Sequence, residues 1–429
     1  MKTKLLTLLV MATLACSCSQ HSDQITNALD YEKYLEASEN RGLELALEDN
    51  TFWKDKLTEN PDQFPFEVKL ASSYSHLFGI TGQIEYLIEA EHHLMHVIEV
   101  TNEKSPGYLK SLASNYISQH KFKDALVLLT KAESIGDNLE GTQKMLFDVH
   151  LELGNYDIAK MYLDKFISFS DFDYLIRLAK WSDHMGNLEA AIDYLEQAKA
   201  IAESSNLVGI KKWVYTNIAD FYGHAGDIQK SYQHYLMALA LDPNDAYSKK
   251  GIAWIVYSHE KNPKEALRIL NKVTETYHAP DYYLLKAEIA DFEGNVVLKN
   301  EQLAHYETAV KNVAYGDMYN KYNVLLYTDE GKHIEEAIVI AKIEVEQRPT
   351  PQSYDLLAWV YYKNGNLDKA LDIVQYHIIN KTFEPHILYH AAEIYKSAGE
   401  MDKVEPLKKE LLASCYELGP IVSKKISQL

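Results

Sequence analysis

Cysteine is scarce in this sequence, and its scarcity excludes several kinds of site. The 429 residues include only three cysteines, Cys16, Cys18 and Cys415. Two of them lie together near the N-terminus, so there is no disulfide framework and no cysteine-based metal or nucleophilic site. The sequence also lacks G-x-G-x-x-G, P-loop, G-x-S-x-G and H-E-x-x-H motifs. We therefore expect no enzymatic activity and no cofactor.

Proline and glycine are also sparse, and long apolar runs are nearly absent. The chain has 11 prolines and 18 glycines, with 47% apolar and 24% charged residues, which is an ordinary composition for a soluble helical protein. The one apolar run, residues 5–15, follows Lys2 and Lys4 and precedes Cys16 and Cys18. At about 10 residues it is too short to span a bilayer, which needs roughly 20. It is typical of a secretory signal.

The residues around the two cysteines resemble the lipobox of bacterial lipoproteins, in which a small residue precedes the cysteine that is acylated. Cys16 follows Ala15 but has Thr13 where the family prefers an aliphatic residue, whereas Cys18 follows Ser17 and has Ala15 at that place. The resemblance implies a signal peptide within residues 1–17, cleavage before Cys16 or Cys18, and lipidation of that cysteine. The alternative is a secretory signal without a lipid.

Basic residues are too few to balance the acidic ones. Removal of the signal takes away two of the 43 basic residues and none of the 62 acidic ones, so the net charge changes from −19 to −21. Such a charge repels nucleic acid and anionic lipid headgroups. We expect no nucleic-acid partner, and membrane attachment through the lipid alone. Residues 18–28 are polar and aperiodic and are predicted to be a flexible tether.

A pattern of small and apolar residues repeats along the chain. In residues 215–243, Ala219, Tyr222, Gly226, Ala238 and Pro243 occur at fixed spacing, and the same spacing recurs upstream and downstream. The pattern resembles the tetratricopeptide repeat, a pair of helices of about 34 residues. By this alignment the units begin near residues 64, 106, 140, 172, 212, 246, 280, 318, 351 and 385.

The resemblance implies an all-α fold, a right-handed superhelix (α-solenoid) of about ten helix hairpins. We expect the repeat array over residues 64–419, an N-terminal helical cap over 29–63 and a short C-terminal tail over 420–429. Glycines such as Gly186 and Gly226 would end the first helix of a hairpin by taking a left-handed conformation. The units near 64, 172 and 280 depart from the pattern and mark unusual loops or longer helices.

In this family the first helices of the hairpins line a concave face that binds partners, and here the C-terminal half of that face is rich in aromatic residues. Such side chains offer large contact area at little entropic cost. A peptide or glycan groove is one interpretation; the other is packing between repeats by an abundant residue, since tyrosine occurs 31 times. The groove residues that the resemblance implies are Trp213, Asp220, His224, Tyr247, Trp254, Tyr257, Tyr319, Tyr322, Trp359, Tyr362 and Tyr389.

One histidine-rich segment resembles a metal site. Glu89, His92 and His96 have helical spacings of three and four residues, which would place them on one helix face. The alternative is a polar outer face that happens to contain histidines. His184 and His224, at equivalent places in successive repeats and near Asp183 and Asp220, present a similar choice between acid–base function and coincidence.

Together these patterns resemble a tetratricopeptide lipoprotein of a Gram-negative bacterium. The resemblance implies a scaffold anchored to the outer membrane, on its periplasmic or surface side, which binds a protein or peptide partner in the cell envelope. Two alternatives remain. One is a lipoprotein that binds a glycan or another small ligand for an outer-membrane uptake system, although the insertions here, of about seven residues, are short for that class. The other is a metal-binding protein that uses His92 and His96.

Overall fold

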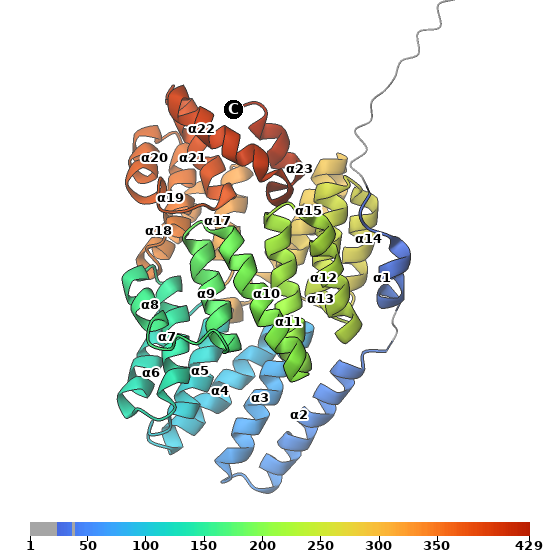
Figure 1. Ribbon diagram of the computed structural model, residues 1–429, viewed down its shortest axis with the longest axis vertical. Helices are drawn as coiled ribbons and strands as arrows, with labels where there is room; N and C mark the ends of the chain where they lie inside the picture. Colours follow the sequence, from blue (N-terminus) through green and yellow to red (C-terminus); the bar gives the residue numbers. More distant parts are fainter. Residues whose placement is uncertain (1–23, 37–38) are drawn as a thin grey trace, which may run out of the picture.

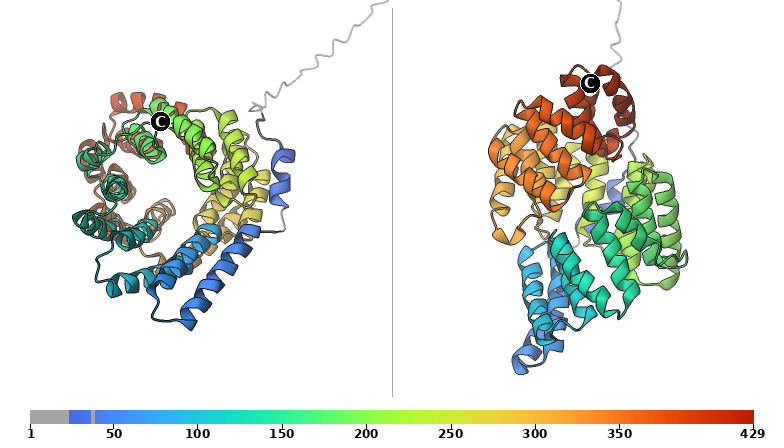
Figure 2. Two further views of the ribbon diagram at one scale, coloured as in Figure 1. Left: turned by 60° about the horizontal axis from the view of Figure 1, so that its bottom comes forward. Right: turned by 90° about the vertical axis from the view of Figure 1, so that its left-hand side faces the viewer.

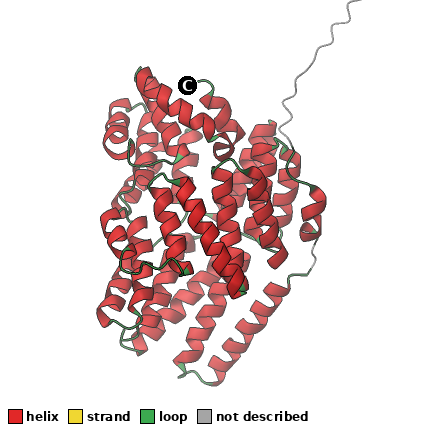
Figure 3. Cartoon of the chain, in the orientation of Figure 1, coloured by secondary structure: helices red, strands yellow, loops and turns green. Residues whose placement is uncertain are grey.

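The computed structural model describes residues 24–36 and 39–429, and in these ranges the chain forms helices and no strands (Figure 3). Twenty of the helices pair with a sequence neighbour to make ten hairpins (Figure 1). The hairpins are α3 (Phe64–Thr81) with α4 (Ile84–Val100), α5 (Pro106–Ser118) with α6 (Phe122–Ile135), α7 (Leu139–Glu152) with α8 (Tyr156–Leu163), α9 (Phe172–His184) with α10 (Leu188–Ser205), α11 (Val208–His224) with α12 (Ile228–Leu241), α13 (Ala246–Trp254) with α14 (Pro263–Val273), α15 (Asp281–Glu293) with α16 (Val296–Ala309), α17 (Asn320–Asp329) with α18 (Ile334–Gln347), α19 (Pro351–Lys363) with α20 (Leu367–Ile373), and α21 (Pro385–Ser397) with α22 (Met401–Ala413). The all-α solenoid expected from the sequence is confirmed.

The hairpins form where the repeat pattern places them. The first helix of each begins at most four residues from the predicted start. Gly186 shows the local cause: its φ of 76° ends α9 in the left-handed region, which favours glycine. Asn187 then caps α10 by accepting a hydrogen bond from the Ala190 amide at 3.1 Å. Small residues such as Ala219 and Ala238 are fully buried, as close approach of the paired helices requires.

Two hairpins contain a wider helical turn. α13 continues directly into the π-helix η1 (Ile255–His259), and α20 continues into the π-helix η3 (Val374–Ile378). A π-helical turn holds more residues than an α-helical one, so side chains that follow it rotate relative to an α-helical register. A short 3-10 helix, η2 (Val313–Tyr315), precedes α17.

The N-terminal segment has two separate parts. The helix α2 (Arg41–Glu59) packs beside α3 and so covers the first hairpin. The helix α1 (Ala28–Leu35) instead lies on α12 and α14, in the middle of the array (Figure 1). Its Tyr31 is 2% exposed and donates a hydrogen bond to Glu265 at 2.7 Å. A single cap over residues 29–63 therefore describes α2 but not α1.

Part of the predicted tether is also held in place. The backbone amides of Ile25 and Thr26 donate hydrogen bonds to the Glu260 carboxylate at 2.9 and 2.6 Å, and Thr26 is buried. Residues 24–28 are thus attached to the array, in contrast to the flexible segment expected there. The predicted signal peptide, the predicted lipidated cysteine and the remainder of the predicted tether lie outside the described residues.

The C-terminal segment closes the array. The helix α23 (Cys415–Ile426) follows the last hairpin, bends at Gly419, where φ is 75°, and packs against α11, η1 and α21. Ile426 and Leu429 are buried in the last hydrophobic cluster. The predicted tail over residues 420–429 is therefore the second part of a packed helix, and Pro420 begins this part directly after the kink at Gly419.

The hairpins wind into a ring in the left view of Figure 2, and successive turns of the superhelix contact each other. The amide of His278 donates a hydrogen bond to the carbonyl of Thr81 at 2.8 Å, and Lys123 donates one to the carbonyl of Glu346 at 3.0 Å. At Gly186 an added Cβ would lie 2.6 Å from the ring of Phe383. The short connections between the two helices of an early hairpin therefore contact the segments that link two successive hairpins about six units further along the chain.

Candidate functional site

A cavity of about 780 Å³ lies on the inner face of the C-terminal half of the array. The first helices of hairpins five to ten form most of its wall, and α23 completes it. The described residues that line it include no serine, threonine or cysteine. The polar and aromatic lining residues are Asp220, Tyr235, Tyr247, Lys250, Trp254, Asp281, Glu288, Lys321, Tyr322, Asp329, Gln352, Asp355, Trp359, Tyr362, Lys363, Glu384, His386, Tyr389, His390, Glu393 and Lys425.

The structure brings seven of the eleven predicted groove residues into this one cavity. They come from five helices, α11, α13, α17, α19 and α21, so the repeats place equivalent positions side by side. The seven are Asp220, Tyr247, Trp254, Tyr322, Trp359, Tyr362 and Tyr389.

The other four predicted residues lie elsewhere. Tyr257 is fully buried because it falls in η1, where the wider turn rotates it into the core. Tyr319 precedes α17 and packs with Tyr306 and Tyr315 in a hydrophobic cluster. Trp213 is 40% exposed outside the cavity, against Phe172.

His224 is the fourth of these residues. It is exposed at the end of α11. Burial raises the pKa of the neighbouring carboxyls Asp183 and Glu417, and the nearby His224 only partly opposes this shift. His184 packs instead on Tyr156, with ring centroids 4.2 Å apart.

The aromatic wall is held rigidly at the α19 and α21 end. The ring of Trp359 stacks on His390 with centroids 3.9 Å apart, and its indole N–H donates a hydrogen bond to Asp329 at 3.1 Å. His390 in turn has its Nδ1 2.9 Å from the Asp355 carboxylate. Tyr362 lies 5.4 Å from Trp359, ring centre to ring centre. A preformed aromatic surface of this kind loses little entropy when a ligand contacts it.

The carboxylates at the opposite end are bonded to tyrosines. Asp220 accepts hydrogen bonds from the hydroxyls of Tyr235 and, at 2.6 Å, Tyr247. Glu288 accepts one from Tyr257 at 3.0 Å. Burial raises the pKa of Asp220, and burial raises the pKa of Glu288 to about 7 although the tyrosine bond opposes this shift. Both shifts mean that the negative charge is poorly compensated.

His386 lies in the lining close to a second histidine and a lysine. Burial, together with the charges of His390 and Lys321, lowers its pKa to about 4. The ring is therefore neutral near pH 7 and contributes a hydrogen-bonding group and not a charge.

Several lining residues were not predicted from the repeat pattern. Tyr235 comes from the second helix of its hairpin, where the pattern predicts core packing. Val422 and Lys425 come from α23, which lies outside the repeats. No local signal in the sequence marks α23 as part of the site. α23 packs closely against the cavity wall, because a Cβ added at Gly419 would lie 3.1 Å from the indole ring of Trp254.

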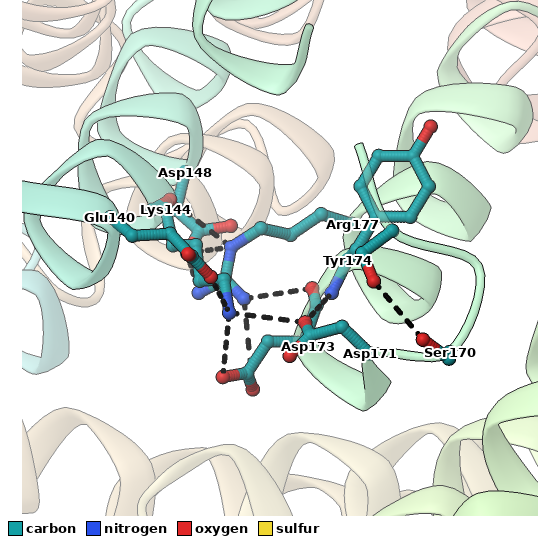
Figure 4. A network of polar contacts seen from close by, with 9 residues as sticks. Glu140, Lys144, Asp148, Ser170, Asp171, Asp173, Tyr174 and Arg177 are labelled. Carbon is teal, nitrogen blue, oxygen red and sulfur yellow. Dashed lines mark hydrogen bonds and ion pairs between the residues drawn. The ribbon is translucent and has the colours of Figure 1, made fainter. Parts of the chain in front are cut away.

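The N-terminal half of the inner face carries charges that neutralise each other. Lys144 lies 2.9 Å from Glu140 and 3.0 Å from Asp171, and Arg177 bonds Asp148 at 2.7 Å (Figure 4). This network joins α7 to α9, and Lys180 pairs with Glu152 at 3.0 Å in the groove beside it. Each of these cations has a carboxylate partner, so the charges of this groove are balanced within the protein and no charged ligand is required to neutralise them.

The structure does not assemble the histidine-rich segment into a metal site. His96 turns toward α3, where its Nδ1 lies 2.7 Å from the Glu67 carboxylate. The described part of the chain contains no group of three or more His, Cys, Asp or Glu side chains able to hold a metal ion. The same part contains no helix long and apolar enough to cross a membrane.

Comparison with known proteins gives a likeness in fold alone. No family model and no curated protein matches the sequence. Human IFIT1, solved as a dimer with PPP-AAAA, is similar over 76% of each chain, with 14% identity and a TM-score of 0.47. Yeast Tom70 is similar over 90% of this chain and 99% of its own, with 13% identity and a TM-score of 0.36. By its own ten hairpins, this chain is a helical-repeat solenoid similar to tetratricopeptide arrays.

Proposed function

We propose that this protein is a lipid-anchored binding scaffold of the cell envelope, and that its inner cavity holds a short segment of a partner protein. The observation that carries the proposal is the convergence of Trp254, Tyr322, Trp359, Tyr362 and Tyr389 on one cavity. Aromatic side chains in a concave site are typical anchors for a ligand. The volume of about 780 Å³ lies within the range of roughly 300–1,000 Å³ found for ligand sites.

The lining favours binding over catalysis. It offers no hydroxyl or thiol of serine, threonine or cysteine as a nucleophile. The His390–Asp355 pair resembles part of a catalytic set, because the Nδ1 of His390 faces the carboxylate. However, one face of the imidazole is covered by Trp359, and His390 is buried. These residues are better described as a rigid support for the indole ring.

The proposal is tested by recovering partners from the native membrane. Crosslinking followed by mass spectrometry should identify proteins that wild type captures and that Trp254→Ala/Trp359→Ala loses. Trp213→Ala is the matched control, because it removes a tryptophan that lies outside the cavity. Capture of the same partners by all three proteins would overturn the assignment of the cavity as the binding site.

A glycan is the second candidate ligand. Flat aromatic rings next to carboxylates, as at Trp254 and Glu288, suit the apolar faces and hydroxyls of a sugar. Saturation binding of neutral oligosaccharides that is lost in Trp254→Ala/Trp359→Ala, without any captured protein, would favour this candidate over a protein segment.

The lipid anchor is proposed from the sequence of residues 1–18. Metabolic labelling with an alkyne fatty acid should mark the protein, and Cys16→Ser and Cys18→Ser separate the two candidate sites. Only one substitution should abolish the label. Labelling that survives the double substitution, or secretion of unlabelled protein, would show that the chain carries no lipid at these cysteines.

A further inference from the structure

The carboxylates of the cavity share an unusual feature, in that most have neutral partners. Glu288 accepts from a tyrosine at 3.0 Å, Asp329 from an indole N–H at 3.1 Å and Glu393 from a tyrosine at 3.1 Å. Asp220 has two tyrosine donors. Among the cavity carboxylates, Asp281 alone forms an ion pair with a lysine of the described part of the chain, at 3.2 Å from Lys250. Hydroxyl and indole donors satisfy the oxygen atoms but supply no positive charge to balance the ionised carboxylates.

The lysines of the cavity do not supply the missing positive charge. Lys250 is already paired with Asp281. Lys363 lies over the face of Trp359, 4.7 Å from the ring centre. Among the described residues, no carboxylate lies within ion-pair distance of Lys321 or Lys425. Lys425 lowers the pKa of Glu288, yet burial still holds that pKa well above its ordinary value.

The ring of Trp254 lies at the same end as these carboxylates. Its centre is 5.6 Å from that of Tyr257, the donor to Glu288, and both it and Glu288 face the kink of α23 at Gly419. An indole face attracts a cation through its quadrupole, most strongly where water is excluded. Carboxylates and an indole together therefore suit a positively charged group, whereas a neutral ligand would leave the carboxylates uncompensated.

We infer that the occupant of the cavity is cationic, and that the partner segment presents an arginine or lysine side chain to Glu288, Asp220 and the face of Trp254. This inference rests on the proposed function, since it names the chemistry of the ligand at the same site. A planar guanidinium is the better fit of the two, because it can stack on an indole ring and donate to a carboxylate at once. The overall negative charge of the chain would also draw a basic segment toward the protein.

The test uses two pools of synthetic octapeptides and the purified full-length protein. In one pool a central arginine is fixed and the other positions are random; in its twin the arginine is replaced by citrulline, which has the same shape and no charge. Affinity selection with mass spectrometry should enrich the arginine pool. Selected peptides should bind about tenfold or more tightly than their citrulline twins, as expected for loss of a charged hydrogen bond.

Isosteric variants locate the effect. Glu288→Gln and Asp220→Asn should each reduce the preference for arginine over citrulline. Glu203→Gln is the matched control, because Glu203 also accepts a hydrogen bond from a tyrosine at 3.0 Å but lies outside the cavity. Its arginine preference should equal that of wild type. Circular dichroism of each variant shows that a lost preference does not reflect unfolding.

The two proposals fail in different ways. Equal enrichment of the two pools, or an arginine preference that survives both cavity variants, overturns the cationic ligand. If partners are still lost in Trp254→Ala/Trp359→Ala, the binding function stands in either case. If neither pool is enriched and the tryptophan variant keeps its partners, the cavity is not the binding site and both proposals fall.

Discussion

Gly251 in α13 is predicted to be irreplaceable, although it lies inside a helix where alanine is normally preferred. A Cβ at this position would lie 2.2 Å from Cζ of Tyr235 and 2.5 Å from both Cε atoms. The ring cannot move aside easily, because Tyr235 is only 4% exposed and its hydroxyl donates to Asp220. Gly251→Ala should therefore displace the ring and break that hydrogen bond.

The free-energy change can be worked from three contributions. Overpacking in a dense core costs about 1–3 kcal/mol. Loss of a hydrogen bond to a charged group costs about 1.5–3 kcal/mol. Replacing a helical glycine with alanine returns about 1 kcal/mol. The free energy of unfolding should thus fall by about 1.5–5 kcal/mol, compared with the roughly 5–15 kcal/mol typical of folded domains.

Urea unfolding followed by far-ultraviolet circular dichroism measures this change. Gly79→Ala is the matched control, because Gly79 lies within α3 and an added Cβ would meet no atom within 4 Å. That variant should be slightly stabilised. Tyr235→Phe separates the contributions, since it removes the hydroxyl and keeps the ring. The reasoning is refuted if Gly251→Ala unfolds at the same urea concentration as Gly79→Ala or at a higher one.

Two further predictions concern buried charge. Because the pKa of Glu288 is raised from 4.5 to about 7, the folded protein between these pH values keeps a proton that the unfolded chain has lost. The free energy of unfolding should therefore fall as the pH rises from 4.5 to about 7, by up to about 3 kcal/mol. In urea unfolding across this range, Glu288→Gln should lose this pH dependence, and an unchanged dependence would contradict the assignment. In the same assay, Arg348→Met should lower the free energy of unfolding by about 3 kcal/mol, because it leaves the buried Glu344 carboxylate without its cation. The guanidinium lies 2.9 Å from this carboxylate, whose side chain is only 4% exposed. Lys332→Met removes the exposed ion pair with Glu330 and should lower the free energy of unfolding by less than about 1 kcal/mol. Equal losses in the two variants would contradict the stabilising role assigned to the buried Arg348–Glu344 pair.

The helix hairpins could be predicted from the sequence because their causes are local. Small residues recur at the helix crossings, and most units have a glycine at the turn, whereas His120 and Lys261 take the left-handed conformation in two of them. These features act within about 34 residues. The same repeat register also predicted that Trp359, Tyr362 and Tyr389 lie on the inner face. Tyr257 did not, because η1 inserts a wider turn that no residue of the repeat pattern indicates.

The closure of the array could not be predicted, because it depends on partners far apart in the chain. Thr26 bonds Glu260, 234 residues away, and the hydroxyl of Ser258 bonds the carbonyl of Tyr416, 158 residues away, at 2.5 Å. Periodicity describes the neighbours of a repeat and contains no information on such pairs. The conversion of an open groove into a cavity by α23 therefore emerged only from the three-dimensional arrangement.

The contacts between successive superhelical turns have a consequence for how this protein can evolve. In an open solenoid a repeat can be duplicated or deleted, because each unit contacts only its neighbours. Here Gly186 must meet Phe383, and Thr81 must meet His278, so the number of units between them is fixed. Insertion of one hairpin between residues 186 and 278 would move both pairs out of register at once. We therefore expect the length of this array to vary far less among its descendants than the sequence of any single repeat.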